Sequence, residues 1–89
     1  MRSAPTAIVL DPHDNVATAI VALAAGQAIS LDAVAVVLVA DIPSGHKFAL
    51  RRIAEGDAVV KYGQPMGRAT AAIEPGQHVH THNVASQRA

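Results

Sequence analysis

The sequence predicts a mainly β protein, built from several short strands joined by glycine corners, with one short helix near the N-terminus. Three observations support this prediction. The apolar runs are short and rich in β-branched residues, glycines recur between them, and a single stretch has helical spacing. The chain of 89 residues is long enough for one small domain, so we expect a single domain over residues 1–89.

The first two elements are expected to be a strand and the helix. The run TAIVL (6–10) is a short apolar stretch that ends at the turn sequence DPHD, which predicts a strand. After this turn, Asp14 suits a helix N-cap, apolar residues follow at helical spacing, and Gly26 suits the position just beyond a helix C-terminus. We therefore expect a helix between Asp14 and Gly26.

Two further runs have the composition of strands. The segment AVAVVLVADI (33–42) is almost continuously apolar, which predicts a strand with both faces covered or a strand that pairs across an interface. The segment KYGQPMGRAT (61–70) contains two glycines within a strand-like run. This pattern predicts a hairpin or a bulged, bent strand.

One motif occurs four times: an apolar residue, two others, glycine, two others and a second apolar residue. Glycine accepts the positive φ that a tight reversal needs, and the flanking apolar residues attach both sides of the reversal to a core. We therefore expect repeated corners. The four segments are LAAGQAI (23–29), IPSGHKF (42–48), IAEGDAV (53–59) and IEPGQHV (73–79).

Charge and composition exclude several classes. Seven basic and seven acidic residues give no net charge, and Phe48 and Tyr62 are the only aromatic residues. Both facts argue against nucleic acid binding, which needs a basic surface or stacking platforms. The absence of cysteine excludes a disulfide framework and a cysteine-type zinc site.

The apolar runs also bear on location and assembly. The N-terminal run is too short for a signal peptide, and Val16 to Ala25 is about half of a membrane span. We therefore expect a cytoplasmic protein without membrane association. A core of small aliphatic side chains lacks large anchors, so we expect the isolated chain to form a homo-oligomer or to need a partner.

Three of the five histidines lie at alternate positions in PGQHVHTHN (75–83). A strand over 77–84 would project His78, His80 and His82 from one face. Alternate positions are about 6.6 Å apart, so two neighbouring imidazoles can reach one ion, whereas three need a bent strand. Imidazole suits several divalent metals, which leaves the metal open. A polar or interface face that happens to be rich in histidine is the alternative.

Other polar residues are weaker candidates when taken alone. His46 and Lys47 follow a glycine corner, and such a pair can bind an anion or transfer a proton. The arginines at 51–52, Lys61 and Arg68 are able to guide a carboxylate, because guanidinium and ammonium groups pair with it. Ordinary solvated charge is the alternative for each of them.

The segment from 42 to 83 resembles the SAF domain of the altronate/galactarate dehydratase family. DNVATAI (14–20) is also similar to that family's N-terminal helix, and the chain as a whole resembles the small subunits that occur as separate chains. The matching elements are Gly45-His46-Lys47, Ala49-Leu50-Arg51, Ile53-Ala54, Lys61-Tyr62-Gly63, Gly67-Arg68-Ala69-Thr70 and His78 through Asn83.

This resemblance implies a β-clip fold and a lyase function. Members of the family eliminate water from altronate- or galactarate-type sugar acids, or sulfite from 3-sulfolactate, at the position β to a carboxylate. They usually use a divalent metal, often iron. The resemblance also implies a large catalytic dehydratase-like subunit as partner, so the isolated chain is expected to be inactive. A non-catalytic module or scaffold that binds a small carboxylate or a metal is the alternative.

Site residues follow from the resemblance, position by position. It implies catalytic roles for His46, His80 and His82, and metal binding by His78, His80 and His82. It also implies contacts with the substrate by Lys47, Lys61, Arg68 and Asn83.

Overall fold

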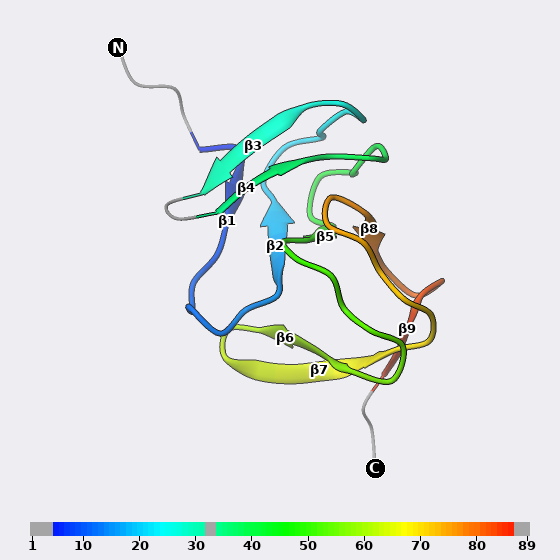
Figure 1. Cartoon of the computed structure of the whole chain (residues 1–89). Coiled ribbons are helices and arrows are strands. Elements are labelled where there is room, and N and C mark those ends of the chain that lie inside the picture. The colour runs from blue at the N-terminus through cyan, green and yellow to red at the C-terminus, as the bar shows by residue number, and fades with distance from the viewer. Residues whose placement is uncertain (1–4, 32–33, 87–89) are drawn as a thin grey trace.

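A four-stranded antiparallel sheet forms the central layer of the protein (Figure 1). The computed structural model describes residues 5–31 and 34–86, and within these ranges the chain forms nine strands and no helix. The strand order of the central sheet is β1-β2-β5-β8. The strands are β1 (Ala7–Ile8), β2 (Val16–Ala19), β3 (Ala28–Leu31), β4 (Val34–Val37), β5 (Lys47–Ala49), β6 (Ala58–Lys61), β7 (Gln64–Ala69), β8 (His78–Val79) and β9 (Val84–Ser86).

Two smaller sheets cover the two faces of the central sheet. The hairpin β3–β4 lies on one side, and the sheet β6-β7-β9 lies on the other (Figure 1). Side chains alternate along the central strands, so Ala17 and Phe48 join the core under β3 and β4, whereas Val16 and Ala49 join the core under β6 and β7. The chain therefore has two hydrophobic cores, and the predicted mainly β class is confirmed.

The four predicted glycine corners are confirmed, and they form two pairs. Leu23 and Ile42, the first residues of two corners, each donate the N–H to the carbonyl oxygen of the other at 2.8 Å. Ile53 and Ile73 exchange the same two hydrogen bonds, also at 2.8 Å. The positive φ expected of the corner glycines is present in all four, at 86° (Gly26), 84° (Gly45), 88° (Gly56) and 84° (Gly76).

Each pair of corners is closed by a second set of reciprocal bonds. The N–H of Gly26 donates to Leu38 O at 2.7 Å, and the N–H of Gly45 donates to Ala19 O at 2.8 Å. The residue four positions before each corner is therefore part of the repeat, although the sequence motif did not include it. The second pair repeats the pattern with Gly56 to Ala69 and Gly76 to Ala49, both at 2.8 Å.

The helix expected between Asp14 and Gly26 is wrong. Val16–Ala19 is strand β2, which pairs with β1 and β5. The Asp14 carboxylate does not cap a helix; it accepts the N–H of Gly63 at 2.8 Å. In a short apolar run that is buried on both faces, the spacing of apolar residues does not distinguish a helix from a strand. Here the segment forms a strand because it pairs with a neighbouring strand on each side.

The hairpin expected within 61–70 is confirmed as β6 and β7. Its turn is Tyr62-Gly63, where both residues have positive φ, 56° and 72°. Two successive positive φ values are the signature of the tight two-residue turn that matches the twist of paired strands. The register shifts between Val59 and Val60, which is the expected bulge.

The apolar segment 33–42 contains strand β4, as predicted, although Ala33 lies outside the described residues. Val36 and Leu38 are buried, whereas Val37 is 56% exposed and Val39 is 61% exposed. The strand is therefore covered on one face only within the chain. A Cβ on Gly76 would overlap the carbonyl oxygen of Val37, so this strand end requires glycine at the neighbouring corner.

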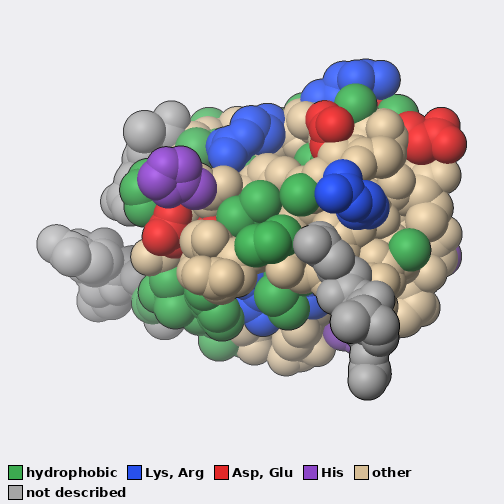
Figure 2. Space-filling model, turned by 90° about the horizontal axis from the view of Figure 1, so that it is seen from below, with side chains coloured by type: hydrophobic (Ala, Val, Ile, Leu, Met, Phe, Trp, Pro, Cys, Tyr) green, Lys and Arg blue, Asp and Glu red, His purple; other side chains and the backbone are tan. Residues whose placement is uncertain are grey.

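Charges are dispersed on the face seen from below. Among the described residues, basic, acidic and apolar side chains are interspersed there, with no large patch of one charge sign (Figure 2). Within 5–31 and 34–86 there is no helix with the length and apolarity of a membrane span.

Candidate functional site

Strands β5 and β8 bring the histidines together. They pair antiparallel with Lys47 opposite Val79 and Phe48 opposite His78, so His46 and His80 face each other just beyond the last pair of the ladder. The His46 and His80 rings stack with centroids 4.3 Å apart and planes at 20°. His46 Nδ1 also lies 2.9 Å from His78 Nε2, close enough for one nitrogen to donate a proton to the other.

His46, His78 and His80 form the three-residue ligand set that the described residues offer to a metal. Their ring nitrogens all lie within 4.8 Å of one another. Nitrogens bound to one tetrahedral ion at about 2.1 Å lie about 3.4 Å apart, so small ring rotations would bring all three to a shared ion. Imidazole is a good ligand for Zn, Fe, Ni and Cu. The donor set therefore fits the divalent metal expected for this chain.

His82 lies beside this group. The single strand expected over 77–84 is wrong, because β8 ends at Val79 and a turn precedes β9. His82 is exposed on that turn, and its ring centroid is 5.4 Å from that of His78, with planes tilted by 36°. The ring nitrogens that converge among the described residues therefore belong to His46, His78 and His80, and His82 of the expected metal set lies next to them on the turn.

Lys47 and His80 share a groove of about 220 Å³ next to the histidines. Burial, and then the positive charge of Lys61, lower the pKa of Lys47. Lys61 itself lies on β6, with its ammonium 4.6 Å from the centre of the Tyr62 ring. The structure therefore places Lys47 near the cluster, and Lys61 is close enough to Lys47 for its charge to act on it.

Several residues that line this groove carried no signal in the sequence. Val59, Val79 and Val84 contribute apolar surface, and Met66, Thr81 and Ser86 complete the lining. Their proximity results from the packing of β6, β7 and β9 beside β8, which no local motif reveals.

Two further residues expected to contact the substrate, Arg68 and Asn83, have side chains that bond to the backbone. Arg68 Nη1 donates to the carbonyl oxygen of Gly56 at 2.9 Å, which holds the guanidinium at a glycine corner. Asn83 is buried, with 5% of its surface exposed, and both ends of its amide bond to the backbone of the histidine turn.

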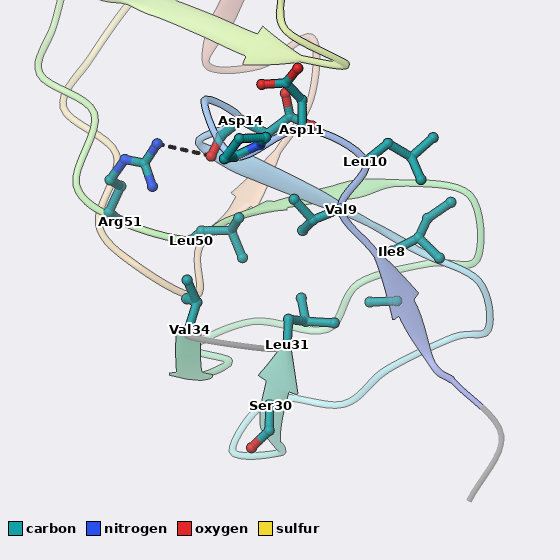
Figure 3. Close-up of a pocket in the computed structure, with 12 residues that line it drawn as sticks. Ile8, Val9, Leu10, Asp11, Asp14, Ser30, Leu31, Val34, Leu50 and Arg51 are labelled. Atoms are coloured by element: carbon teal, nitrogen blue, oxygen red, sulfur yellow. Dashed lines mark hydrogen bonds between the residues drawn. The ribbon is translucent and has the colours of Figure 1, made fainter.

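A larger groove of about 610 Å³ lies along β1 (Figure 3). Arg51 stands at one end, where Nη2 donates to the carbonyl oxygen of Asp14 at 2.9 Å. Arg51 follows β5, whereas His46 precedes it, so this arginine belongs to the other end of the strand. The apolar lining consists of Ala7, Ile8, Val9, Leu10, Leu31, Val34 and Leu50.

His78 and His80 are harder to protonate than free imidazole. Burial, and then charge on His46, lower the pKa of His78. Loss of hydration, and then charge on His46, lower the pKa of His80. Both effects favour the neutral imidazole of His78 and His80, the state in which imidazole binds metals.

The lowered pKa values predict a pH-dependent stability of the metal-free chain. Well above the ordinary pKa of about 6.5, His78 and His80 are neutral in both the folded and the unfolded chain, so they add no pH dependence. Below that pH the unfolded chain takes up protons that folded His78 and His80 resist, so the free energy of unfolding falls. Urea unfolding at pH 7.5 and 5.5 measures this loss. The double variant His78→Gln, His80→Gln should lose less; an equal loss would contradict the assignment.

Comparison with known proteins identifies the family of the chain. The altronate/galactarate dehydratase SAF domain model matches residues 5–87. An altronate dehydratase of Escherichia coli is 53% identical over 70 residues, which are 79% of this chain but 14% of the relative. The chain thus spans about one seventh of that relative's length.

Shorter relatives are also similar to the chain. The (2R)-sulfolactate sulfo-lyase subunit alpha of Paracoccus pantotrophus is 49% identical over 49 residues, which are 55% of this chain and 73% of the relative. The subunit alpha of Chromohalobacter salexigens is 49% identical over 47 residues, which are 53% of this chain and 50% of the relative. Together with the match over 5–87, these likenesses show that the chain belongs to the altronate/galactarate dehydratase SAF domain family.

Proposed function

We propose that this domain is the small subunit of a lyase, and that its histidine cluster forms one side of an active site completed by a large catalytic chain. The observation that carries the proposal is the convergence of His46, His78 and His80 beside the groove that contains Lys47. Relatives named altronate dehydratase and sulfolactate sulfo-lyase subunit alpha support the reaction class.

The proposed reaction is an elimination β to a carboxylate. A base removes the proton α to the carboxylate, the C–H electrons form the new double bond, and the bond from the β carbon to the leaving group breaks. Departing hydroxide takes a proton and leaves as water, whereas sulfite leaves without that proton. Sugar acids related to altronate and galactarate, and 3-sulfolactate, are the substrates of this kind that we propose.

The residues of the site suit separate parts of this reaction. His46, His78 and His80 would hold the divalent metal, and Lys47 and Lys61 would pair with the substrate carboxylate. A divalent metal bound there supplies Lewis-acid stabilisation of the negative charge that develops beside the carboxylate. Fe(II) is one of the ions that imidazole suits.

Proton transfer is the remaining task. His82 is exposed on the turn beside His78, outside the three-histidine set, and imidazole both accepts and donates protons near neutral pH. We assign His82 to proton transfer at the mouth of the site. The guanidinium of Arg68 is held at the glycine corner by its bond to Gly56 O, so we propose that it contacts the large chain or the distal part of a long substrate.

Reconstitution tests the proposal. The chain and a large altronate dehydratase-type chain from the same genome are assayed separately and together with altronate, galactarate and (2R)-sulfolactate. We expect turnover of one of these acids by the mixture with Fe²⁺, and none by either chain alone. A mixture that converts none of them would overturn the lyase proposal. If the chain nevertheless bound metal, the alternative of a non-catalytic binding module would stand.

A further inference from the structure

Asn83 lies under the turn that carries the histidines. Its Oδ1 accepts the N–H of His80 at 2.9 Å, and its Nδ2 donates to the carbonyl oxygen of His78 at 2.8 Å. The backbone of Asn83 adds a bond from its own N–H to His80 O at 3.1 Å and accepts the N–H of Thr70 at 2.9 Å. One side chain therefore ties together the backbone of two histidines, and Thr70 ties the turn to the end of β7.

These bonds hold the backbone from which two imidazoles project. The chain leaves β8 after Val79, so His80 has no ladder partner to hold its N–H. The Asn83 amide replaces that partner and keeps His80 in line with His78. The His80 ring stays stacked on His46 as long as the turn keeps this shape.

Burial separates a positioning role from substrate binding. Asn83 is 5% exposed, and its amide oxygen and amide nitrogen both have partners within the turn. A substrate would have to break these bonds to reach the amide, which would leave backbone groups of the turn unpaired at a cost of about 1–3 kcal/mol. Asn83 is therefore poorly placed for the substrate contact expected from the sequence.

We propose that Asn83 is a positioning residue for the metal centre, which sets the geometry of His78 and His80 through their backbone. The inference rests on the proposed metal site. Residues that orient metal ligands through hydrogen bonds typically change metal affinity by about 10- to 100-fold when they are removed.

Asn15 provides a matched control elsewhere in the fold. Its Nδ2 donates to Ala58 O at 2.9 Å and its Oδ1 accepts the N–H of Val60 at 2.8 Å. Both asparagines thus use the same amide groups on two backbone partners 2 residues apart, but Asn15 holds β6. Replacing either one removes the same kind of bonds, and only Asn83 touches the histidine turn.

The test is a Co²⁺ titration of the full chain, followed by visible absorption, with thermal unfolding measured in parallel. We expect Asn83→Ala to bind Co²⁺ about 10- to 100-fold more weakly than the wild type and to change the absorption bands. Asn15→Ala should lower the unfolding temperature to a similar degree and keep wild-type affinity. Asn83→Ser, whose hydroxyl can keep one of the two bonds, should lie between wild type and Asn83→Ala and serves if the alanine variant does not fold.

The outcomes separate the two proposals. Wild-type affinity in Asn83→Ala, or in Asn83→Ser where only that variant folds, would overturn the role of Asn83 and leave the metal site intact. Equal losses in Asn15→Ala and Asn83→Ala would also overturn it, because general destabilisation would then explain both. A wild-type chain that binds no Co²⁺ would overturn the metal site and, with it, the positioning role.

Discussion

Replacing His46 or His80 by alanine is expected to lower the kcat of the reconstituted two-chain enzyme by about 100-fold or more, because each variant loses a proposed ligand of the metal that would stabilise the developing charge, an effect of several kcal/mol. His46 is the central member of the cluster, because it contacts His78 through Nδ1 and stacks on His80. Removal of either ring takes away a proposed ligand and opens the stack. Steady-state kinetics at saturating Fe²⁺, with the fold of each variant checked by circular dichroism, measure the loss.

His13 is the control for this prediction. Its side chain is 85% exposed and it pairs with Asp11 at 3.0 Å, away from the three-histidine set. His13→Ala should keep kcat within twofold of the wild type. A His46→Ala enzyme that kept more than a tenth of the wild-type kcat would contradict a catalytic role for the cluster.

Phe48→Ala is expected to lower the free energy of unfolding by about 3–5 kcal/mol, as for other large-to-small changes in a core. Phe48 is fully buried on β5, between Ala17 on β2 and His78 on β8. It is also the chain's single phenylalanine, in a core of smaller aliphatic residues. Because a domain of this size has little stability to spare, this variant should be largely unfolded at 37 °C.

Urea unfolding of Phe48→Ala and Phe48→Leu measures this effect. The leucine variant keeps most of the buried volume and should lose less than about 1.5 kcal/mol. A loss below 1 kcal/mol in Phe48→Ala would show that the core on this side of the sheet collapses around the missing ring, against the expectation for a tightly packed interior.

The repeated corners were the part of the fold most accessible from the sequence. Glycine with positive φ is a local requirement, so four glycines at matching positions predicted four similar turns. The pairing of these corners was not accessible, because Leu23 and Ile42 meet through backbone bonds that no side-chain pattern encodes. The helix expected from Asp14 failed for the same reason: pairing with β1 and β5 outweighed a local preference.

In the candidate site, too, local sequence features were predictable and features that depend on strand pairing were not. Spacing and resemblance identified the histidine-rich segment. The structure brings His78 and His80 of that segment together with His46, which the sequence offered as a separate candidate. The approach of His46 to His78 and His80 depended on the β5–β8 register. The position of His82 depended on where β8 ends, since the apolar and polar alternation continues past that point.

The central claim is that His46, His78 and His80 bind one metal ion per chain. Calorimetric titration of Zn²⁺ at pH 7.5 into the wild type, His46→Ala and His82→Ala tests it most directly. We predict binding of one ion by the wild type and by His82→Ala, and loss of that binding in His46→Ala. Loss in His82→Ala with full binding by His46→Ala, or no heat with the wild type, would contradict the claim.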